Sequence, residues 1–216
     1  MKVLITLPEY DPCVKCISEW NKKLVVPLAE KRSDKCDLIR TTSVRRSTVE
    51  HKIKKEDYNL LIFNGHGSIS GDSICGHSGE EIIKFGENHN LLDTRIVHSF
   101  TCCSGKVLGK NSNSEAFIGY DNMFSFWMHR TTTTRPLEDI LAKPNMISAL
   151  TVPIKLLKGA KASEAFDKSQ EKYQEFIDDY LWNDAKYTKE ELDRVLPFLM
   201  ANKKAQKLHG NKDAEV

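Results

Sequence analysis

Residues 58–64 read YNLLIFN, a nearly continuous apolar run that ends at Gly65. A run of this length, rich in aliphatic residues and closed by glycine, is typical of a strand buried on both faces. Two more segments read as strands further along, 94–102 (TRIVHSFTC) and 116–120 (AFIGY). Strands with continuous apolar character predict a mostly parallel sheet that helices cover on both sides.

The segments around these runs predict the remaining elements. Two further strands are expected at 2–7 and 37–43. Helices are expected at 17–31, which Pro27 would kink or shorten, at 49–56, at 147–157, at 163–181 with Ser163 as its cap, and from the capping box at 188–191 onward. Segments 68–90 and 131–144 are rich in turn residues and are expected to be loops suited to cleavage or gating.

This alternation predicts an α/β fold, a three-layer sandwich with a mostly parallel, doubly wound sheet and a C-terminal helical extension. We expect the main domain at 1–182. The extension is expected at 183–216, and the residues after His209 are expected to form a frayed, solvated tail.

The composition does not exclude any class of partner, but it gives no reason to expect a strongly charged partner such as nucleic acid or a membrane surface. The net charge is +2, from 32 basic and 30 acidic residues, and no stripe of alternating basic and aromatic residues appears. We therefore expect neither nucleic acid nor membrane as a partner. The apolar run at 3–5 is too short for a signal peptide, and no run is long enough to span a bilayer, which predicts a cytoplasmic protein.

Thiols stay reduced in the cytoplasm, so the six cysteines are expected to be free thiols, metal ligands or nucleophiles. They are Cys13, Cys16, Cys36, Cys75, Cys102 and Cys103. A single Cys13-x-x-Cys16 pair is weak evidence for zinc or redox chemistry, since a structural zinc site needs four ligands. Cys36, Cys75 and His77 would complete such a site only if folding gathered them. No metal and no cofactor is expected.

Two strand ends carry reactive side chains. His66 lies in Asn64-Gly-His-Gly-Ser68, directly after the first strand quoted, and Cys102 lies in Thr101-Cys-Cys-Ser-Gly105, at the end of the second. Reactive groups in open α/β sheets collect where the strands end. If the two strands are parallel neighbours, an imidazole and a thiol reach the same rim, as nucleophilic catalysis requires.

The glycines beside these residues have a chemical meaning as well. Gly67 has no side chain, so its N–H can approach a substrate carbonyl closely. Gly105 permits a tight turn into a following helix, whose positive end would favour the Cys102 thiolate. The alternatives are plainer: His66 as a hydrogen-bonded turn histidine, and the two vicinal cysteines as small apolar residues that close a strand.

The order His-Gly after one strand and Cys-x-Ser-Gly after the next resembles the caspase-hemoglobinase fold, which unites caspases, legumain, gingipain, clostripain, separase and CHAT peptidases. Residues 116–119 (AFIG), 157–159 (LKG) and 163–165 (SEA) resemble the later core strand and final helix of the gingipain–CHAT branch. The histidine and cysteine lie closer together here than the 50 or so residues that separate them in caspases. That spacing is compatible with one helix between the two strands.

The resemblance implies a cysteine endopeptidase that acts on a protein or peptide substrate. His66 would be the base, Cys102 the nucleophile, and the N–H groups of Gly67 and Cys102 the oxyanion hole, with no third triad member required. Cys103 is the alternative nucleophile, because Cys103-Ser-Gly fits the tighter caspase spacing. Relatives are often zymogens or need an activating protein partner.

The resemblance also places Asp121 near a position that lines the specificity pocket of some members. There it would favour Arg or Lys before the scissile bond; otherwise it caps a turn. His77, His98 and His129 are simplest as surface or core residues. Two other functions stay open, a catalytically silent caspase-like interaction module and a thiol-based acyl transferase.

Overall fold

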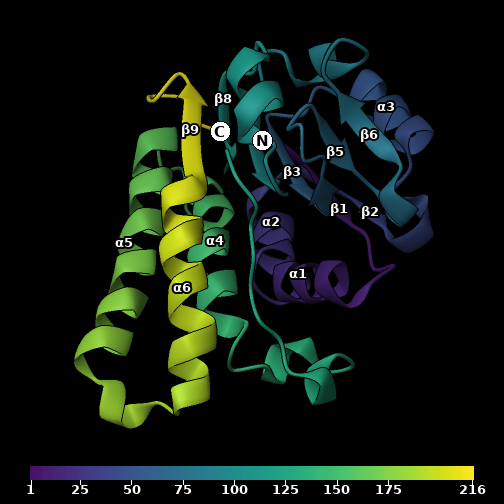
Figure 1. Ribbon diagram of the computed structural model, residues 1–216. Coiled ribbons are helices and arrows are strands. Elements are labelled where there is room, and N and C mark those ends of the chain that lie inside the picture. The colour runs from purple at the N-terminus through teal and green to yellow at the C-terminus, as the bar shows by residue number, and fades with distance from the viewer.

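A six-stranded sheet with the strand order β2-β1-β3-β7-β8-β9 forms the centre of the protein (Figure 1). The computed structural model describes residues 1–216, apart from the side chain of Asp184. The six strands are β1 (Lys2–Leu7), β2 (Lys35–Arg40), β3 (Leu60–Asn64), β7 (Ile96–Phe100), β8 (Ala116–Tyr120) and β9 (Gln206–Gly210). β1, β2, β3, β7 and β8 are parallel to one another, and β9 is antiparallel to β8. The predicted α/β fold with a mostly parallel sheet is confirmed.

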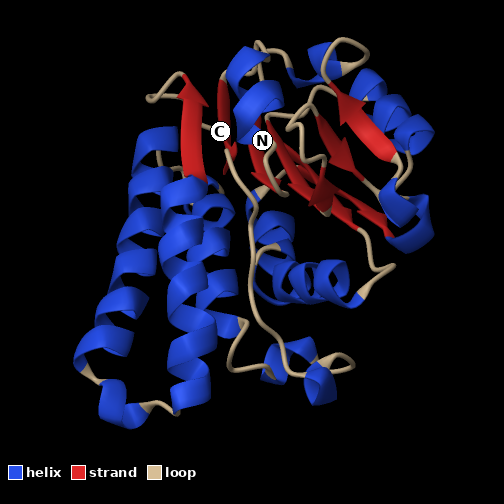
Figure 2. Cartoon of the chain, in the orientation of Figure 1, coloured by secondary structure: helices blue, strands red, loops and turns tan.

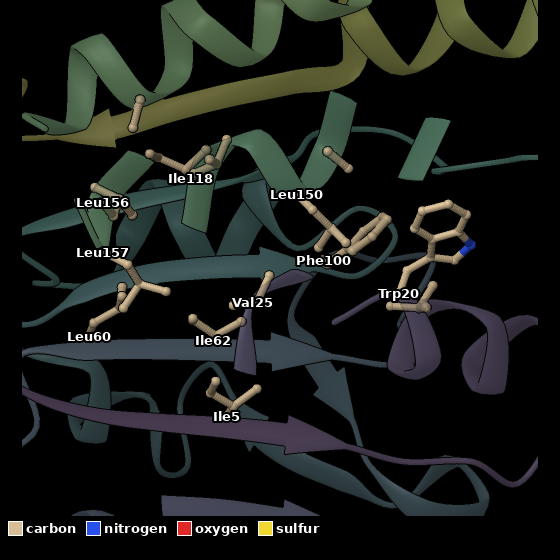
Figure 3. Packing of buried hydrophobic residues seen from close by; sticks show 14 of the residues in the cluster. Ile5, Trp20, Val25, Leu60, Ile62, Phe100, Ile118, Leu150, Leu156 and Leu157 are labelled. Carbon is tan, nitrogen blue, oxygen red and sulfur yellow. The ribbon is translucent and has the colours of Figure 1, made fainter. Parts of the chain in front are cut away.

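Both faces of the sheet are buried. Consecutive side chains of a strand point to opposite faces, so a strand buried on both faces contributes to two apolar clusters. In β3, Leu60 and Ile62 join one apolar cluster, while Leu61 and Phe63 join another on the opposite face. Figure 3 shows the first cluster, in which Ile62 and its neighbours on the sheet meet side chains from the helices, such as Trp20. Burial on both faces explains why these strands are continuous apolar runs.

Helices α1 (Pro12–Leu24), α2 (Val26–Arg32), α4 (Lys143–Leu156) and α5 (Ala162–Trp182) contribute to the first cluster. Helix α3 (Arg46–Lys55) covers the other face. The single helix expected at 17–31 is two helices that meet at Val25, and Pro27 lies in the first turn of α2, where its missing N–H costs nothing.

A small antiparallel sheet connects β3 to β7 where the spacing would also have allowed a helix, and it takes up part of the segment 68–90 that was expected to be loop. Its strands are β4 (His66–Gly67), β5 (Ser73–Cys75) and β6 (Glu81–Lys84). The β-branched residues Ile74, Ile82 and Ile83 are fully buried in the second cluster, which favours strands over a helix here. Single turns of 3₁₀ or π-helix occur at Thr41–Ser43, His77–Gly79, His89–Leu92, Gly105–Gly109, Arg130–Thr132, Pro136–Glu138 and Asp184–Lys186.

Helices α5 and α6 (Lys189–Ala205) run side by side and share an apolar cluster of their own (Figures 1 and 2). The predicted capping box at the start of α6 is confirmed: the Thr188 hydroxyl accepts the Glu191 N–H, and the Glu191 carboxylate accepts the Thr188 N–H. Within the described part of the chain, no helix combines the length and apolar character that crossing a membrane requires.

The C-terminal segment is ordered, which corrects the expectation of a frayed tail. β9 pairs with β8 along its whole length, and Ala214 is 1% exposed. The carbonyls of Ala214 and Lys212 accept the first free N–H groups of α5, those of Ala162 and Ser163. Ser163 therefore lies inside the helix and does not cap it. The local sequence did not predict this segment. Its structure depends on pairing with the edge strand β8 and on hydrogen bonds to the first N–H groups of α5.

Candidate active site

His66 and Cys102 lie two residues beyond the carboxyl ends of two neighbouring strands. β3 and β7 are parallel and in register, with Asn64 opposite Phe100. The condition on which the sequence argument depended, that these strands are parallel neighbours, is met. Both side chains line one cavity, so the fold brings the imidazole and the thiol to the same rim.

The His66 imidazole is held by an acidic residue from a third strand end. Nε2 of His66 lies 2.8 Å from Oδ2 of Asp11, which follows β1. The other carboxylate oxygen of Asp11 accepts the Val14 N–H and caps α1. A carboxylate only accepts hydrogen bonds, so the proton of the neutral ring lies on Nε2 and Nδ1 is left as the basic nitrogen. The ring of Tyr10 packs edge-on against His66, with centroids 6.0 Å apart.

Asp11 was missed by sequence reasoning, which identified no orienting group for the histidine. The signal was present, because Asp11 follows the predicted strand at 2–7 just as His66 follows the predicted strand at 58–64. β1 is the parallel neighbour of β3. Three consecutive positions in the sheet, β1, β3 and β7, therefore each deliver one polar side chain to the same edge.

The Cys102 thiol is partly buried in its resting state. Sγ donates a long hydrogen bond to the Phe124 carbonyl, 3.5 Å away, and burial raises the pKa of the thiol. A five-residue π-helical turn, Gly105–Gly109, follows the cysteines. The predicted helical turn does begin at Gly105, and the stabilisation of the Cys102 thiolate by that turn stays a prediction.

Cys103 occupies a different environment from Cys102. It is 4% exposed, it does not line the cavity, and its backbone adopts the left-handed conformation with φ of 56°. Its N–H donates to the Asn122 carbonyl at 3.0 Å. Of the two cysteines, the structure brings only Cys102 together with His66.

Gly67 packs directly against the backbone of Cys102. A Cβ atom at Gly67 would lie 2.0 Å from the Cys102 carbonyl oxygen, so no other residue fits without displacing the loop. Ser68 donates to Ser73 across the small sheet. Hydrogen-bonded and non-bonded pairs alternate in antiparallel sheets, so the N–H of Gly67 points away from β5. The Cys102 N–H makes no backbone hydrogen bond to another described residue, and it interacts with its own thiol.

The shared cavity has a volume of about 210 Å³ and is mainly apolar. It is lined by Cys13, Ile17, Gly65, His66, Phe100, Thr101, Cys102, Met123, Phe124, Ser125 and Phe126. These residues come from the start of α1, the ends of β3 and β7, and the segment that follows β8. A cavity of this size is below the roughly 300–1,000 Å³ of sites that enclose whole small molecules, so it suits one side chain.

Asp121 lies outside this cavity. Its Oδ1 is 3.3 Å from Nε2 of His209 on β9, and its backbone N–H donates to the Ala205 carbonyl. A Cβ atom at Gly105 would lie 2.5 Å from the same Oδ1, so Asp121 packs against the turn behind the cysteines. The geometry gives no support to Asp121 as a residue that lines a specificity pocket.

The remaining cysteines are dispersed. Cys13 lines the cavity, Cys16 is buried under the sheet, and Cys36 and Cys75 lie on β2 and β5. All six cysteines are free. Across the described residues, no three His, Cys, Asp or Glu side chains are placed to hold a metal ion. His98 is fully buried, and neither ring nitrogen has a partner in the described structure.

The mostly parallel sheet with helices on both sides has the layout of a caspase-like α/β fold. Comparison with solved structures finds the crystal structure of the arginine-specific cysteine proteinase gingipain R, with a TM-score of 0.56 over the whole of this chain. The two sequences are 12% identical, and this chain spans 47% of the gingipain R chain, so the likeness establishes the fold alone. No protein-family model and no curated protein matches the sequence.

Proposed function

We propose that this chain is a cysteine endopeptidase in which Cys102 is the nucleophile and His66 the general acid–base. The observation that carries the proposal is the meeting of His66, already oriented by Asp11, with Cys102 at one cavity where adjacent parallel strands end. The caspase-like fold supports it, since that fold is shared with a cysteine proteinase.

In this mechanism Nδ1 of His66 takes the thiol proton, and the Cys102 sulphur attacks the carbonyl carbon of the scissile peptide bond. The new oxyanion accepts hydrogen bonds from the N–H groups of Gly67 and Cys102. His66 then gives its proton to the departing amine, which leaves an acyl-enzyme on Cys102. Water, deprotonated by His66, attacks the thioester and releases the acid and the free thiol.

Asp11 acts through His66 as a positioning residue. It keeps the ring proton on Nε2, so that Nδ1 faces the reaction, and it stabilises the imidazolium that forms when the thiol loses its proton. His66 supplies the base that forms the thiolate, because a neutral thiol is a poor nucleophile. The partly buried resting thiol is also compatible with activation by processing or by a protein partner, which we include in the proposal. A reactive thiol must stay reduced, as it would in the cytoplasm, the location that the sequence predicts.

A thiol-directed substrate analogue tests the proposal. Purified protein would be treated with a peptidyl acyloxymethyl ketone, and the modified residue located by intact mass and peptide mapping. We expect labelling at Cys102 that Cys102→Ala abolishes, that His66→Ala slows about 100-fold or more, and that Cys103→Ala retains.

Each of the other outcomes would contradict a specific part of the proposed function. Labelling lost only in Cys103→Ala would move the nucleophile by one residue. Labelling at Cys102, together with amide-forming instead of hydrolysis products when unlabelled protein is incubated with a peptide ester and an amine, would identify an acyl transferase. No labelling of any cysteine, before or after limited proteolysis, would identify a silent interaction module.

A further inference from the structure

We infer that the cavity beside Cys102 is the subsite for the residue before the scissile bond, and that it selects an uncharged apolar side chain of the size of Leu, Met or Phe. This inference rests on the proposed function. It concerns the residue called P1 below, whose carbonyl carbon Cys102 would attack.

The cavity is in the right place for this residue. Cys102 and His66 form part of its wall, so a residue whose carbonyl carbon Cys102 attacks has its side chain next to the cavity. The volume of about 210 Å³ suits one side chain and not a longer stretch of peptide.

Most of the wall is apolar. Ile17 on α1 lines the cavity, and Phe124 and Phe126 in the segment after β8 supply aromatic surface. Phe100 and Phe124 pack edge to face with centroids 4.6 Å apart, which fixes the shape of the floor. Met123 is 49% exposed at the rim, and its flexible side chain can adapt to residues of different shape.

No carboxylate is available to pair with a Lys or Arg inside the cavity. Asp11 is occupied by His66 and the start of α1, and Asp121 lies outside, against His209. The buried Asp139 accepts hydrogen bonds from the N–H groups of His129, Leu141 and Ala142 and from the Thr132 hydroxyl. None of the three acids lines the cavity.

No Lys or Arg lines the cavity either, so an acidic P1 residue would be equally unpaired. A charge buried without a partner is strongly disfavoured, whereas apolar surface gains from leaving water. The same walls that reject both signs of charge therefore favour aliphatic and aromatic side chains.

Ser125 offers a way to reverse this preference. Its backbone is anchored on both sides by Asn202, which accepts the Ser125 N–H at 3.0 Å and donates to the Ser125 carbonyl at 2.6 Å. Its hydroxyl has no partner among the described residues, so a new side chain at this position enters the cavity without disturbing the loop. Ser125→Asp would place a carboxylate there, and Ser125→Asn is the uncharged control of the same size.

The test uses peptidyl acyloxymethyl ketones that differ only at P1, with Leu, Met, Phe, Lys, Arg or Asp, and measures the rate at which each labels Cys102. We expect the apolar reagents to label at least about tenfold faster than the charged ones. In Ser125→Asp the ratio of Lys to Leu labelling should rise at least about tenfold, and in Ser125→Asn it should stay near the wild-type value. Circular dichroism and thermal melting would verify that both variants are folded.

Labelling of Cys102 at equal rates by all reagents, or faster by Lys or Asp, would overturn the inference and leave the peptidase proposal standing. An unchanged ratio in a folded Ser125→Asp variant would also overturn it, because the cavity would then not hold P1. No labelling of Cys102 by any reagent would overturn the proposed function, and this inference with it.

Discussion

Oδ2 of Asp11 lies 2.8 Å from Nε2 of His66, while Oδ1 of the same carboxylate caps helix α1. One side chain thus ties the position of α1, which carries Cys13 and Ile17 into the cavity wall, to the orientation of the histidine. The Asp11 carboxylate therefore contacts both the candidate base and the helix that supplies part of the cavity wall.

Replacement of Asp11 should separate these two roles. Asn caps helices about as well as Asp, so Asp11→Asn should keep the stability within about 0.5 kcal/mol and lower kcat about 100-fold, because an amide can donate to Nε2 and favour the wrong tautomer. Asp11→Ala should lose activity and about 1 kcal/mol of stability together. Urea unfolding and peptide hydrolysis would be measured on both. Full activity in Asp11→Asn would contradict the positioning role.

Gly67→Ala should inactivate the protein. The added Cβ would lie 2.0 Å from the Cys102 carbonyl oxygen, so the loop that carries both oxyanion donors must move. Loss of one such donor costs about 100- to 1,000-fold in rate. The measurement is kcat/KM for peptide hydrolysis. Gly86→Asn is the control, since a Cβ at Gly86 meets nothing within 4 Å and Asn tolerates its positive φ. A Gly67→Ala variant as active as this control would exclude Gly67 from the oxyanion hole.

Asp121→Asn should leave the P1 preference unchanged, because Asp121 does not line the cavity. The relative labelling rates of the Leu and Lys ketones would be compared with those of the wild type. A lower rate for Lys alone in Asp121→Asn would show that Asp121 reaches the substrate, against the geometry described here.

The buried histidine should make stability fall with acid. Burial lowers the pKa of His98 to about 3, below its value of about 6.5 in an unfolded chain. As the pH falls below about 6.5, the unfolded state therefore binds a proton at His98 that the folded state does not bind. The free energy of unfolding should decrease by about 2 kcal/mol between pH 7 and pH 5 because of this group. Above pH 7 the group contributes no pH dependence.

His98→Leu removes this proton uptake and two buried nitrogens that have no described partner. Urea unfolding at pH 7 and pH 5 should show a smaller loss of stability in His98→Leu than in the wild type, by about 2 kcal/mol. His51, which is exposed on α3, provides the control variant His51→Leu. Equal acid sensitivity in all three proteins would contradict the buried, neutral state of His98.

The C-terminal segment should be part of the stable fold. Ala214 is 1% exposed and packs against the main core, so Ala214→Asp buries an unpaired charge and should cost about 2–3 kcal/mol. Glu215→Gln, at the exposed neighbouring position, should change stability by less than about 0.5 kcal/mol. Chemical denaturation would compare the two. Equal stability of the two variants would mean that the segment is detached in solution.

The strands of the parallel sheet could be predicted from sequence because a strand buried on both faces consists of a continuous run of apolar residues. The run at 58–64 and the strand at 116–120 required no knowledge of their neighbours. The two reactive strand ends, His66 and Cys102, followed from the rule that parallel strands finish at one rim.

Elements that are held in place by residues far away in the sequence show no such pattern in their own residues. β9 is a strand because β8 has an open edge, and its residues QKLHG have no pattern of their own. The same holds for the tail that closes the start of α5. The small sheet between β3 and β7 was hidden by its many turn residues, although its isoleucines pack into the core.

The sequence by itself determined the α/β class, the order of most strands and helices, and the two strand ends that carry an imidazole and a thiol. The tertiary structure alone decided which groups lie near one another. Register and strand order bring Asp11 to His66, a left-handed backbone turns Cys103 away from the cavity that Cys102 lines, and pairing with β9 holds Asp121 outside it. The physical reason is that periodicity and turn chemistry act over a few residues, whereas a site is assembled from segments that only the packing of the whole sheet brings within hydrogen-bonding distance.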